Sequence, residues 1–217
     1  MKILYGGCWY FFRSVFGTIF RCRIYNAERV PPQGPFILAS NHASFFDPPL
    51  IGSSCPREIS YLARESLFRY PVVGPILKAV NAIPVNRDGG GAAGLKGILD
   101  RLRQGGGIIL FPEGTRTADG TLQPARSGIG LTVIKSEAPV VPTRVFGTFE
   151  AMSRHAWFPK PHPVRVKFGR PLYFDEERAQ SRICPKSRLK EIYREVADRL
   201  MREIAKLEPC GDKAEFP

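Results

Sequence analysis

Two short polar motifs constrain the fold of this 217-residue chain more than any other feature. Residues 41–47 read Asn-His-Ala-Ser-Phe-Phe-Asp and follow the apolar run 36–39. Residues 111–116 read Phe-Pro-Glu-Gly-Thr-Arg and follow the apolar run 108–110. Such short runs indicate buried strands, and open α/β sheets keep their chemistry where the strands end. The motifs therefore predict an α/β fold with a functional site at one edge of its sheet.

Seven segments are expected to be strands, and several are continuous apolar or β-branched runs, as in strands covered on both faces. These segments are 23–26, 36–40, 60–63, 82–85, 108–111, 140–146 and 164–168. Helices are expected at 92–103 and 186–207, where apolar residues recur every three or four positions, and 127–136 is a further short candidate. Asp47 is expected to be the N-cap of a further helix, with Pro48 at its first position.

The composition allows one sizeable core, because 43% of the residues are hydrophobic. We therefore predict a single α/β domain at 23–207, with a mixed, mostly parallel central sheet flanked by helices. Residues 1–22 are expected to form a membrane-anchoring segment, and residues 208–217 a flexible tail.

The net charge of +12 suggests an anionic partner, which could be nucleic acid, an acidic membrane surface or a phosphorylated substrate. The basic residues are dispersed and match no aromatic–basic motif of RNA or DNA modules, so we expect no nucleic-acid partner. Five cysteines without a Cys-x-x-Cys pair argue against a disulfide framework and a structural zinc site, and favour a reduced cytosolic compartment. No cluster of metal ligands is visible, so we expect no metal.

Residues 3–20 are apolar and aromatic but are interrupted by Arg13. On a helix, one stripe would collect Leu4, Cys8, Phe11, Phe12, Val15, Phe16 and Ile19. Three interpretations compete: a signal peptide, a core helix packed on the sheet, and an amphipathic helix lying in the plane of a membrane. No small-residue cleavage site follows, and the segment is marginal in length for a spanning helix. We favour the in-plane helix, with nearby basic residues at the headgroups of an anionic leaflet.

In the first motif, His42 and Asp47 are five positions apart and would point away from each other on one continuous helix. They can work together only if His42 lies in the loop after the strand and Asp47 begins the helix. Asp47 would then accept a hydrogen bond from one imidazole nitrogen, leaving the other to take a proton from a substrate hydroxyl. Ser44 is close in sequence, but nothing marks it as a nucleophile. The pair therefore suits direct attack by a substrate hydroxyl, although a histidine satisfied by a helix-capping aspartate is the structural alternative.

The second motif combines groups that can bind an anion. Gly114 lets backbone amides approach it, Arg116 can grip it with two nitrogens, and Thr115 can donate a hydrogen bond. Glu113 could hold a substrate hydroxyl or orient Arg116. Arg87 is expected at the end of another strand, although surface arginines are usually only solvated.

Taken in order, these pieces resemble the glycerolipid acyltransferase family, and within it the 1-acylglycerol-3-phosphate (lysophosphatidate) acyltransferase branch. The matching segments are 41–47, 83–87, 111–116 and 140–142. The resemblance implies that His42 is the general base and Asp47 its partner. It also implies that Arg87, Glu113 and Arg116 bind the glycerol phosphate, at a site shaped by backbone around Gly114.

The chain departs from the family pattern at two positions. Arg126 stands where relatives often carry an aromatic residue followed by Lys, and it is the expected basic residue of the phosphate site. Asn81 stands near the start of the second motif, where relatives often have Gly.

The resemblance implies transfer of a fatty acyl group to the sn-2 hydroxyl of lysophosphatidate, which yields phosphatidate. The donor would be an acyl thioester, either acyl-CoA or acyl carrier protein, and no cofactor would be required. The enzyme would work at the cytoplasmic face of the cell membrane, because its acceptor is a membrane lipid.

Three alternatives stay open. The acceptor could be glycerol 3-phosphate, another lysophospholipid or a lyso-aminolipid. The chain could also be a non-catalytic membrane-binding protein or, from its charge alone, a nucleic-acid-binding module.

Overall fold

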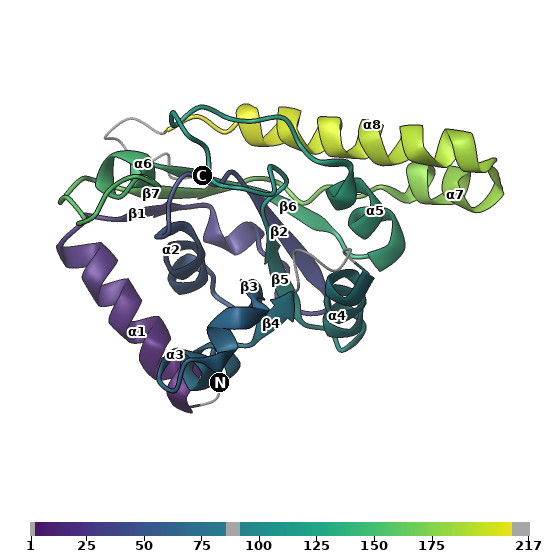
Figure 1. Ribbon diagram of the computed structural model, residues 1–217. Coiled ribbons are helices and arrows are strands. Elements are labelled where there is room, and N and C mark those ends of the chain that lie inside the picture. Colours follow the sequence, from purple (N-terminus) through teal and green to yellow (C-terminus); the bar gives the residue numbers. More distant parts are fainter. Residues whose placement is uncertain (1–2, 86–91, 210–217) are drawn as a thin grey trace.

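A seven-stranded sheet forms the centre of the computed structural model, which describes residues 3–85 and 92–209 (Figure 1). The strands run in the order β1-β7-β6-β2-β5-β3-β4. Their bounds are β1 Arg23–Tyr25, β2 Phe36–Ser40, β3 Ile59–Arg64, β4 Ala82–Val85, β5 Gly107–Leu110, β6 Val140–Phe146 and β7 Arg165–Phe168. All neighbouring strands are parallel except β6 and β7. The predicted mixed, mostly parallel sheet is therefore confirmed.

The sheet is flanked by helices on both faces (Figure 1). The α-helices are α1 Ile3–Thr18, α2 Asp47–Ser54, α3 Val73–Ala79, α4 Ala92–Arg103, α5 Ser127–Ser136, α6 Thr148–Ala151, α7 Asp175–Ile183 and α8 Lys186–Ala205. Two short 3-10 helices, η1 Ala27–Arg29 and η2 Glu65–Arg69, complete the described elements.

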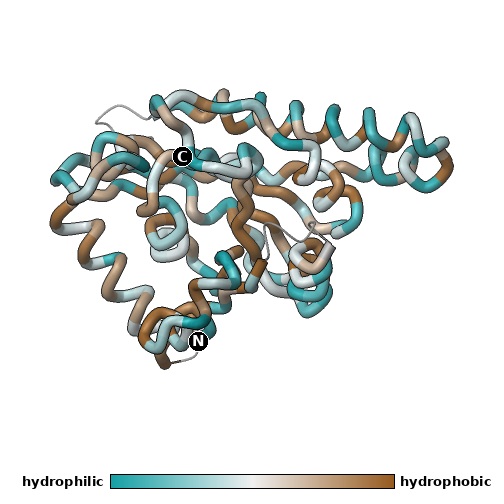
Figure 2. Tube along the Cα trace, viewed as in Figure 1, coloured by the Kyte–Doolittle hydropathy of each residue, from teal (hydrophilic) through white to brown (hydrophobic). Residues whose placement is uncertain are grey.

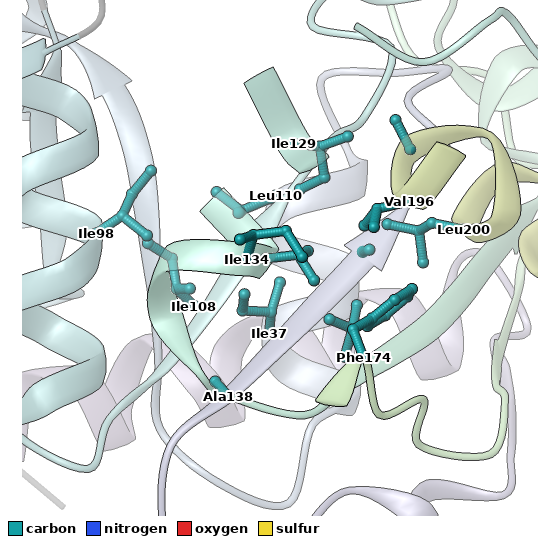
Figure 3. Close-up of a cluster of buried hydrophobic side chains, with 14 of the residues drawn as sticks. Ile37, Ile98, Ile108, Leu110, Ile129, Ile134, Ala138, Phe174, Val196 and Leu200 are labelled. Carbon is teal, nitrogen blue, oxygen red and sulfur yellow. The ribbon is translucent and has the colours of Figure 1, made fainter. Parts of the chain in front are cut away.

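Strand β2 contributes to both halves of the core, because its successive side chains point to opposite faces of the sheet. Ile37 and Ala39 belong to the half covered by α4, α5 and α8, which Figure 3 shows in close-up. Phe36 and Leu38 belong to the other half, which α1 and α2 cover. The whole strand is buried, and this explains why its sequence is a continuous apolar run rather than an alternating one.

Helices α5 and α8 pack very closely on the first face. A Cβ atom at Gly130 of α5 would lie 1.8 Å from the carbonyl oxygen of Tyr193 in α8, so any larger residue would force the two helices apart. Ile129 and Val133 of α5 belong to the same buried cluster as Val196 of α8. Figure 3 labels Ile129 and Val196 in this cluster.

Helix α1 is partly a core helix. Phe16 is buried with Phe20 in the second half of the core, and Phe12 and Val15 pack against them. The apolar stripe expected from the sequence is thus divided, because Leu4, Phe11 and Ile19 of the same stripe remain exposed. Figure 2 shows this run of apolar residues along α1, in contrast to the hydrophilic α7 at the other end of the molecule. No helix in 3–85 or 92–209 is both long and apolar enough to cross a bilayer.

The sequence-based boundaries need small corrections. The first strand ends at Tyr25 because Asn26 adopts a left-handed conformation, with φ +59°. The fifth strand spans Gly107–Leu110, so Phe111 lies in the loop beyond it. The last helix ends at Ala205. Helices α3, α6 and α7 were not expected, and the division at residues 22 and 207 stays a prediction.

Candidate active site

The loop between β2 and α2 brings His42 and Asp47 together. His42 Nδ1 lies 2.8 Å from Asp47 Oδ2, so the hydrogen bond expected from the sequence is present. The imidazole lies flat on the ring of Phe111, with 3.9 Å between ring centroids. Asp47 is fully buried, whereas the His42 side chain keeps 17% exposure. Nε2 is therefore the nitrogen left for a substrate.

Asp47 does not cap its helix as we expected. Helix α2 begins at Asp47, with Phe46 at the capping position and no side-chain capping bond. The carboxylate turns back instead, and Oδ2 accepts hydrogen bonds from the backbone amides of Ala43 at 2.6 Å and Ser44 at 2.7 Å. One oxygen thus fixes both the imidazole and the backbone that carries it.

The 41–46 loop is anchored by three further contacts. The Asn41 side chain pairs with both backbone groups of Val145 in β6, donating to its carbonyl at 3.2 Å and accepting from its amide at 2.9 Å. The carbonyl of His42 accepts from the amide of Thr117 at 2.8 Å. The Ser44 hydroxyl donates to the carbonyl of Met152 at 2.6 Å and accepts from an amide of its own loop. Ser44 therefore holds the loop and does not face His42 as a nucleophile would.

Sequence reasoning assigned no role to Asn41, Phe111 or Thr117. Each lies in or beside the two motifs. Asn41 acts through its side-chain amide, Phe111 through its ring face and Thr117 through its backbone amide, and motif spacing does not reveal such contacts.

Glu113 holds the histidine loop from the loop that follows the neighbouring strand, β5. Its side chain is 3% exposed, and its Oε1 accepts a hydrogen bond from the backbone amide of His42 at 3.2 Å. Burial raises the pKa of Glu113 from 4.5 to about 7, against the lowering effect of backbone hydrogen bonds from His42 and Gln123, and nearby Asp47 raises it further. The geometry gives Glu113 a positioning role, and direct contact with an acceptor stays a prediction.

Replacing Glu113 with Gln should change how stability depends on pH. A folded-state pKa of about 7, against 4.5 when unfolded, means that the folded wild type binds the proton more tightly. Glu113 therefore adds to the free energy of unfolding of the wild type. This contribution, roughly 3 kcal/mol, is complete below pH 4.5 and is lost as the pH rises through 7. The variant lacks this loss. The difference in unfolding free energy, variant minus wild type, should therefore rise between pH 4.5 and 7 and then level off.

Urea unfolding of both proteins across this pH range would measure that difference, since shared titrations cancel. A difference that stays flat would show that folding does not raise the pKa of Glu113. In an activity assay Glu113→Gln should lose less than Glu113→Ala, because an amide oxygen can still accept from the His42 amide.

Gly114 of the second motif lies against the side chain of Arg126. Gly114 has φ +71°, a conformation that glycine adopts without strain, and a Cβ there would lie 2.7 Å from Cδ of Arg126. The backbone amide of Arg126 donates to the carbonyl of Pro112 at 2.8 Å, and its side chain is exposed. The predicted basic residue thus lies directly over the glycine turn.

Arg116 joins the second motif to the first. Its guanidinium carbon lies 3.4 Å from the centroid of the Phe45 ring, in the histidine loop. Thr115 is exposed beside it. Arg87, which is expected in this site, lies outside the described residues. The structure therefore brings Glu113, Gly114 and Arg116 beside the His42 loop.

The assembled groups can act on a hydroxyl near an anion. The imidazole is oriented by a buried carboxylate and can take a proton, and a guanidinium stands on the adjoining aromatic ring. Across the described residues, no group of three or more His, Cys, Asp or Glu side chains is arranged to hold a metal ion. The absence of a cofactor stays a prediction.

Comparison with known proteins gives the family. A family model described as Acyltransferase matches residues 21–145, more than half of the chain and both motifs. The chain belongs to the acyltransferase family. This confirms the family inferred from the motifs, and it identifies the chain as an enzyme of acyl transfer.

Two relatives of this acyltransferase bear the name of the branch that the motifs resemble. This chain is 28% identical to the 1-acyl-sn-glycerol-3-phosphate acyltransferase of Bacillus subtilis, over 70% of this chain and 73% of the relative. It is also 28% identical to the chloroplastic 1-acyl-sn-glycerol-3-phosphate acyltransferase BAT2 of Brassica napus, over 71% of this chain. The match covers 46% of the Brassica protein, so the chain spans about half of that relative.

A solved structure supports the fold of this acyltransferase. The crystal structure of PlsC, the 1-acyl-sn-glycerophosphate acyltransferase of Thermotoga maritima, superposes with a TM-score of 0.71 at 23% identity. The match covers 95% of this chain and 81% of that one. At this identity the match shows a shared fold.

Proposed function

We propose that this acyltransferase moves a fatty acyl group from an acyl thioester to the sn-2 hydroxyl of lysophosphatidate and forms phosphatidate. The observation that carries the proposal is the His42–Asp47 pair at 2.8 Å, with Arg116 on the adjoining Phe45 ring. Base and cation together suit a hydroxyl substrate that also bears a phosphate. The names of the relatives support the same acceptor.

His42 acts as the general base in this proposal. Nε2 takes the proton of the sn-2 hydroxyl as its oxygen bonds to the thioester carbonyl carbon. The carbon–sulfur bond of the tetrahedral intermediate then breaks, and the leaving thiolate takes the proton back from the imidazolium. Asp47 holds Nδ1 throughout and stabilises the positive charge on the ring.

The acceptor phosphate is held by basic side chains at the second motif. Arg126 lies over the Gly114 turn, Arg116 lies on the Phe45 ring, and Thr115 adds an exposed hydroxyl. Arg87 belongs to the same proposed set. The donor is acyl-CoA or acyl carrier protein, and neither reaction requires a cofactor.

Helix α1 attaches the enzyme to the cytoplasmic face of the cell membrane in this proposal. Its exposed large apolar side chains are Ile3, Leu4, Tyr10 and Phe11, and the exposed Ile19 follows its last residue. Its other face is occupied by the domain, because Trp9 Nε1 donates to the Cys55 carbonyl and Arg13 to the Ser53 carbonyl. Deleting residues 1–20 would therefore remove part of the core, and single surface substitutions test membrane attachment better.

The test is an acyl-transfer assay in detergent micelles, with a long-chain acyl thioester and lysophosphatidate. Both CoA and carrier-protein donors are tried, and glycerol 3-phosphate serves as the competing acceptor. Phosphatidate formed by the intact protein and not by His42→Ala supports the reaction, the acceptor and the base. Product only with another acceptor would overturn the lysophosphatidate assignment.

Arg116→Ala should chiefly weaken binding of the acceptor. A hydrogen bond to a charged group contributes about 1.5–3 kcal/mol, so the KM for lysophosphatidate should rise by roughly 10- to 100-fold. The KM for the thioester should change little, and Arg116→Lys should recover part of the loss. Arg182→Ala, an exposed arginine of α7, is the matched control. An unchanged acceptor KM would mean that the phosphate is held elsewhere.

A further inference from the structure

The 152–163 loop, which is most of the connection between α6 and β7, exposes two adjacent aromatic side chains. Trp157 is 92% exposed and Phe158 is 80% exposed. Single exposed apolar residues are ordinary, but neighbouring aromatic side chains so fully in water mark a surface that binds something. Neither residue belongs to a motif or takes part in the proposed reaction.

The charge of this loop indicates what it binds. Residues 151–164 contain no Asp or Glu, and the exposed side chains of Arg154 and Lys160 flank the aromatic pair. Tryptophan and long basic side chains are the groups that settle at the headgroup level of a bilayer. Basic residues at this level are attracted electrostatically to the headgroups of an anionic leaflet. The loop is therefore complementary to an anionic lipid surface.

The loop also emerges at the edge of the sheet where the proposed chemistry lies. Strand β6 is parallel to β2, and its last residue, Phe146, pairs with Arg165, the first residue of β7. The connection between β6 and β7 therefore leaves and returns at the edge where β2 delivers His42. The hydrogen bond from Ser44 to the Met152 carbonyl, at 2.6 Å, ties the start of the 152–163 loop to the histidine loop.

The residue that follows this loop, Val164, is hydrogen-bonded to the segment that follows α1. The Val164 amide donates to the Phe20 carbonyl at 3.0 Å, and the Arg23 amide donates to the Val164 carbonyl at 3.1 Å. Figure 1 shows the connection between α6 and β7 beside the upper end of α1, opposite the projecting ends of α7 and α8. Helix α1 and the 152–163 loop, two segments with exposed apolar side chains that are far apart in sequence, thus come close together at one side of the molecule.

We propose that the 152–163 loop is a second membrane contact, in which Trp157 and Phe158 enter the interface of an anionic bilayer while Arg154 and Lys160 meet lipid phosphates. The proposal rests on the proposed function insofar as the acceptor is a membrane lipid. Two contacts, the loop and α1, orient the domain on the surface, whereas α1 alone would let it rotate. The carboxyl edge of the sheet then faces the leaflet, and an acceptor reaches His42 without leaving the lipid phase.

The two tryptophans of the chain allow a direct test. Trp9→Phe leaves Trp157 as the only tryptophan and keeps an aromatic ring against α2. On addition of vesicles containing phosphatidylglycerol, the emission of this variant should shift to shorter wavelength, and lipids brominated near the headgroup should quench it. Neutral phosphatidylcholine vesicles should produce a smaller change. Emission that stays constant while the protein pellets with anionic vesicles would overturn the proposal.

Substitution gives an independent readout. The double variant Trp157→Ser/Phe158→Ser should bind anionic vesicles about tenfold more weakly than wild type. Tyr173→Ser/Ile183→Ser is the matched control, because both side chains are exposed, at 60% and 88%, and lie outside the loop. Leu4→Ser/Phe11→Ser probes α1 in the same assay. Wild-type vesicle binding by the loop variant, with loss only in the α1 variant, would overturn the loop proposal.

Activity in detergent micelles separates this proposal from the reaction itself. The loop variant should retain wild-type acyl transfer there, because it leaves His42 and Asp47 untouched. If wild type makes no phosphatidate but its binding to vesicles still depends on Trp157, the proposed function fails and the membrane contact stands. If the loop substitutions change only the oligomeric state in solution, the surface binds a second copy of the chain and the membrane contact is overturned.

Discussion

His42→Ala should lower acyl transfer by about 10³-fold or more while leaving the fold intact. A positioned general base contributes about 10²–10⁴-fold, and without it the sn-2 hydroxyl must lose its proton to water. The fold should survive because the loop is held by the backbone of His42 and not by its ring. The His42 amide donates a hydrogen bond to Glu113, and the His42 carbonyl accepts one from the Thr117 amide. Phosphatidate formation in micelles, measured with the thermal unfolding midpoint, checks both parts.

The control for this variant is His155→Ala, because His155 is exposed and outside the site. The control should keep wild-type turnover. Turnover by His42→Ala within a few-fold of wild type would remove His42 from the role of base. A folding defect in His42→Ala would instead point to the structural alternative, a histidine that merely satisfies Asp47.

Asp47 should show the second large effect, and its two substitutions should differ. Asp47→Asn keeps an oxygen that can accept from the Ala43 and Ser44 amides, but it removes the charge that stabilises the imidazolium. Its kcat should fall by about 10²–10⁴-fold with modest loss of stability. Asp47→Ala also leaves two buried amides without partners, and each such group costs about 1–3 kcal/mol.

Asp47→Ala should therefore combine the catalytic loss with a clearly lower free energy of unfolding. Urea unfolding and single-turnover kinetics on the same preparations separate the two effects. Equal activity of Asp47→Asn and wild type would show that the carboxylate only organises the loop. A stable Asp47→Ala would mean that the Ala43 and Ser44 amides find other partners.

Much of the sheet could be predicted because fully buried strands need continuous apolar sequence. Each of the seven expected segments contains most of a strand, and the helices at 92–103 and 127–136 have the expected bounds. Helix α7 was not predicted because most of its residues are acidic or otherwise polar. Arg178 is the one residue of this helix that is buried. Its amphipathic pattern carries too little apolar signal for detection by periodicity.

The wide apolar stripe of α1 shows a different limit. Periodicity predicts that a helix has an apolar side, but not how much of that side the domain will cover. In α1, Phe16 is buried in the core, whereas Phe11 is exposed at the surface. The core-helix and surface-helix interpretations each describe one part of the same stripe.

In the site, spacing and residue type predicted the His42–Asp47 hydrogen bond, which needs only a loop before a helix. The position of Glu113 under the His42 amide could not be predicted, because it depends on the pairing of β2 with β5. The departure at Asn81 has a simple conformational reading. Asn81 has φ +59°, which asparagine tolerates better than most residues, so it can stand where relatives often have glycine.

The histidine loop has no regular secondary structure, yet it should be among the stiffest parts of the molecule. The amides of His42, Ala43 and Ser44 all donate to buried carboxylates, and the Asn41 side chain extends the pairing of β2 with β6. The entropy of ordering this loop is therefore spent during folding rather than at each encounter with substrate. Catalytic geometry that exists before the acceptor arrives leaves only the acceptor and the exposed outer side chains to be ordered in each turnover.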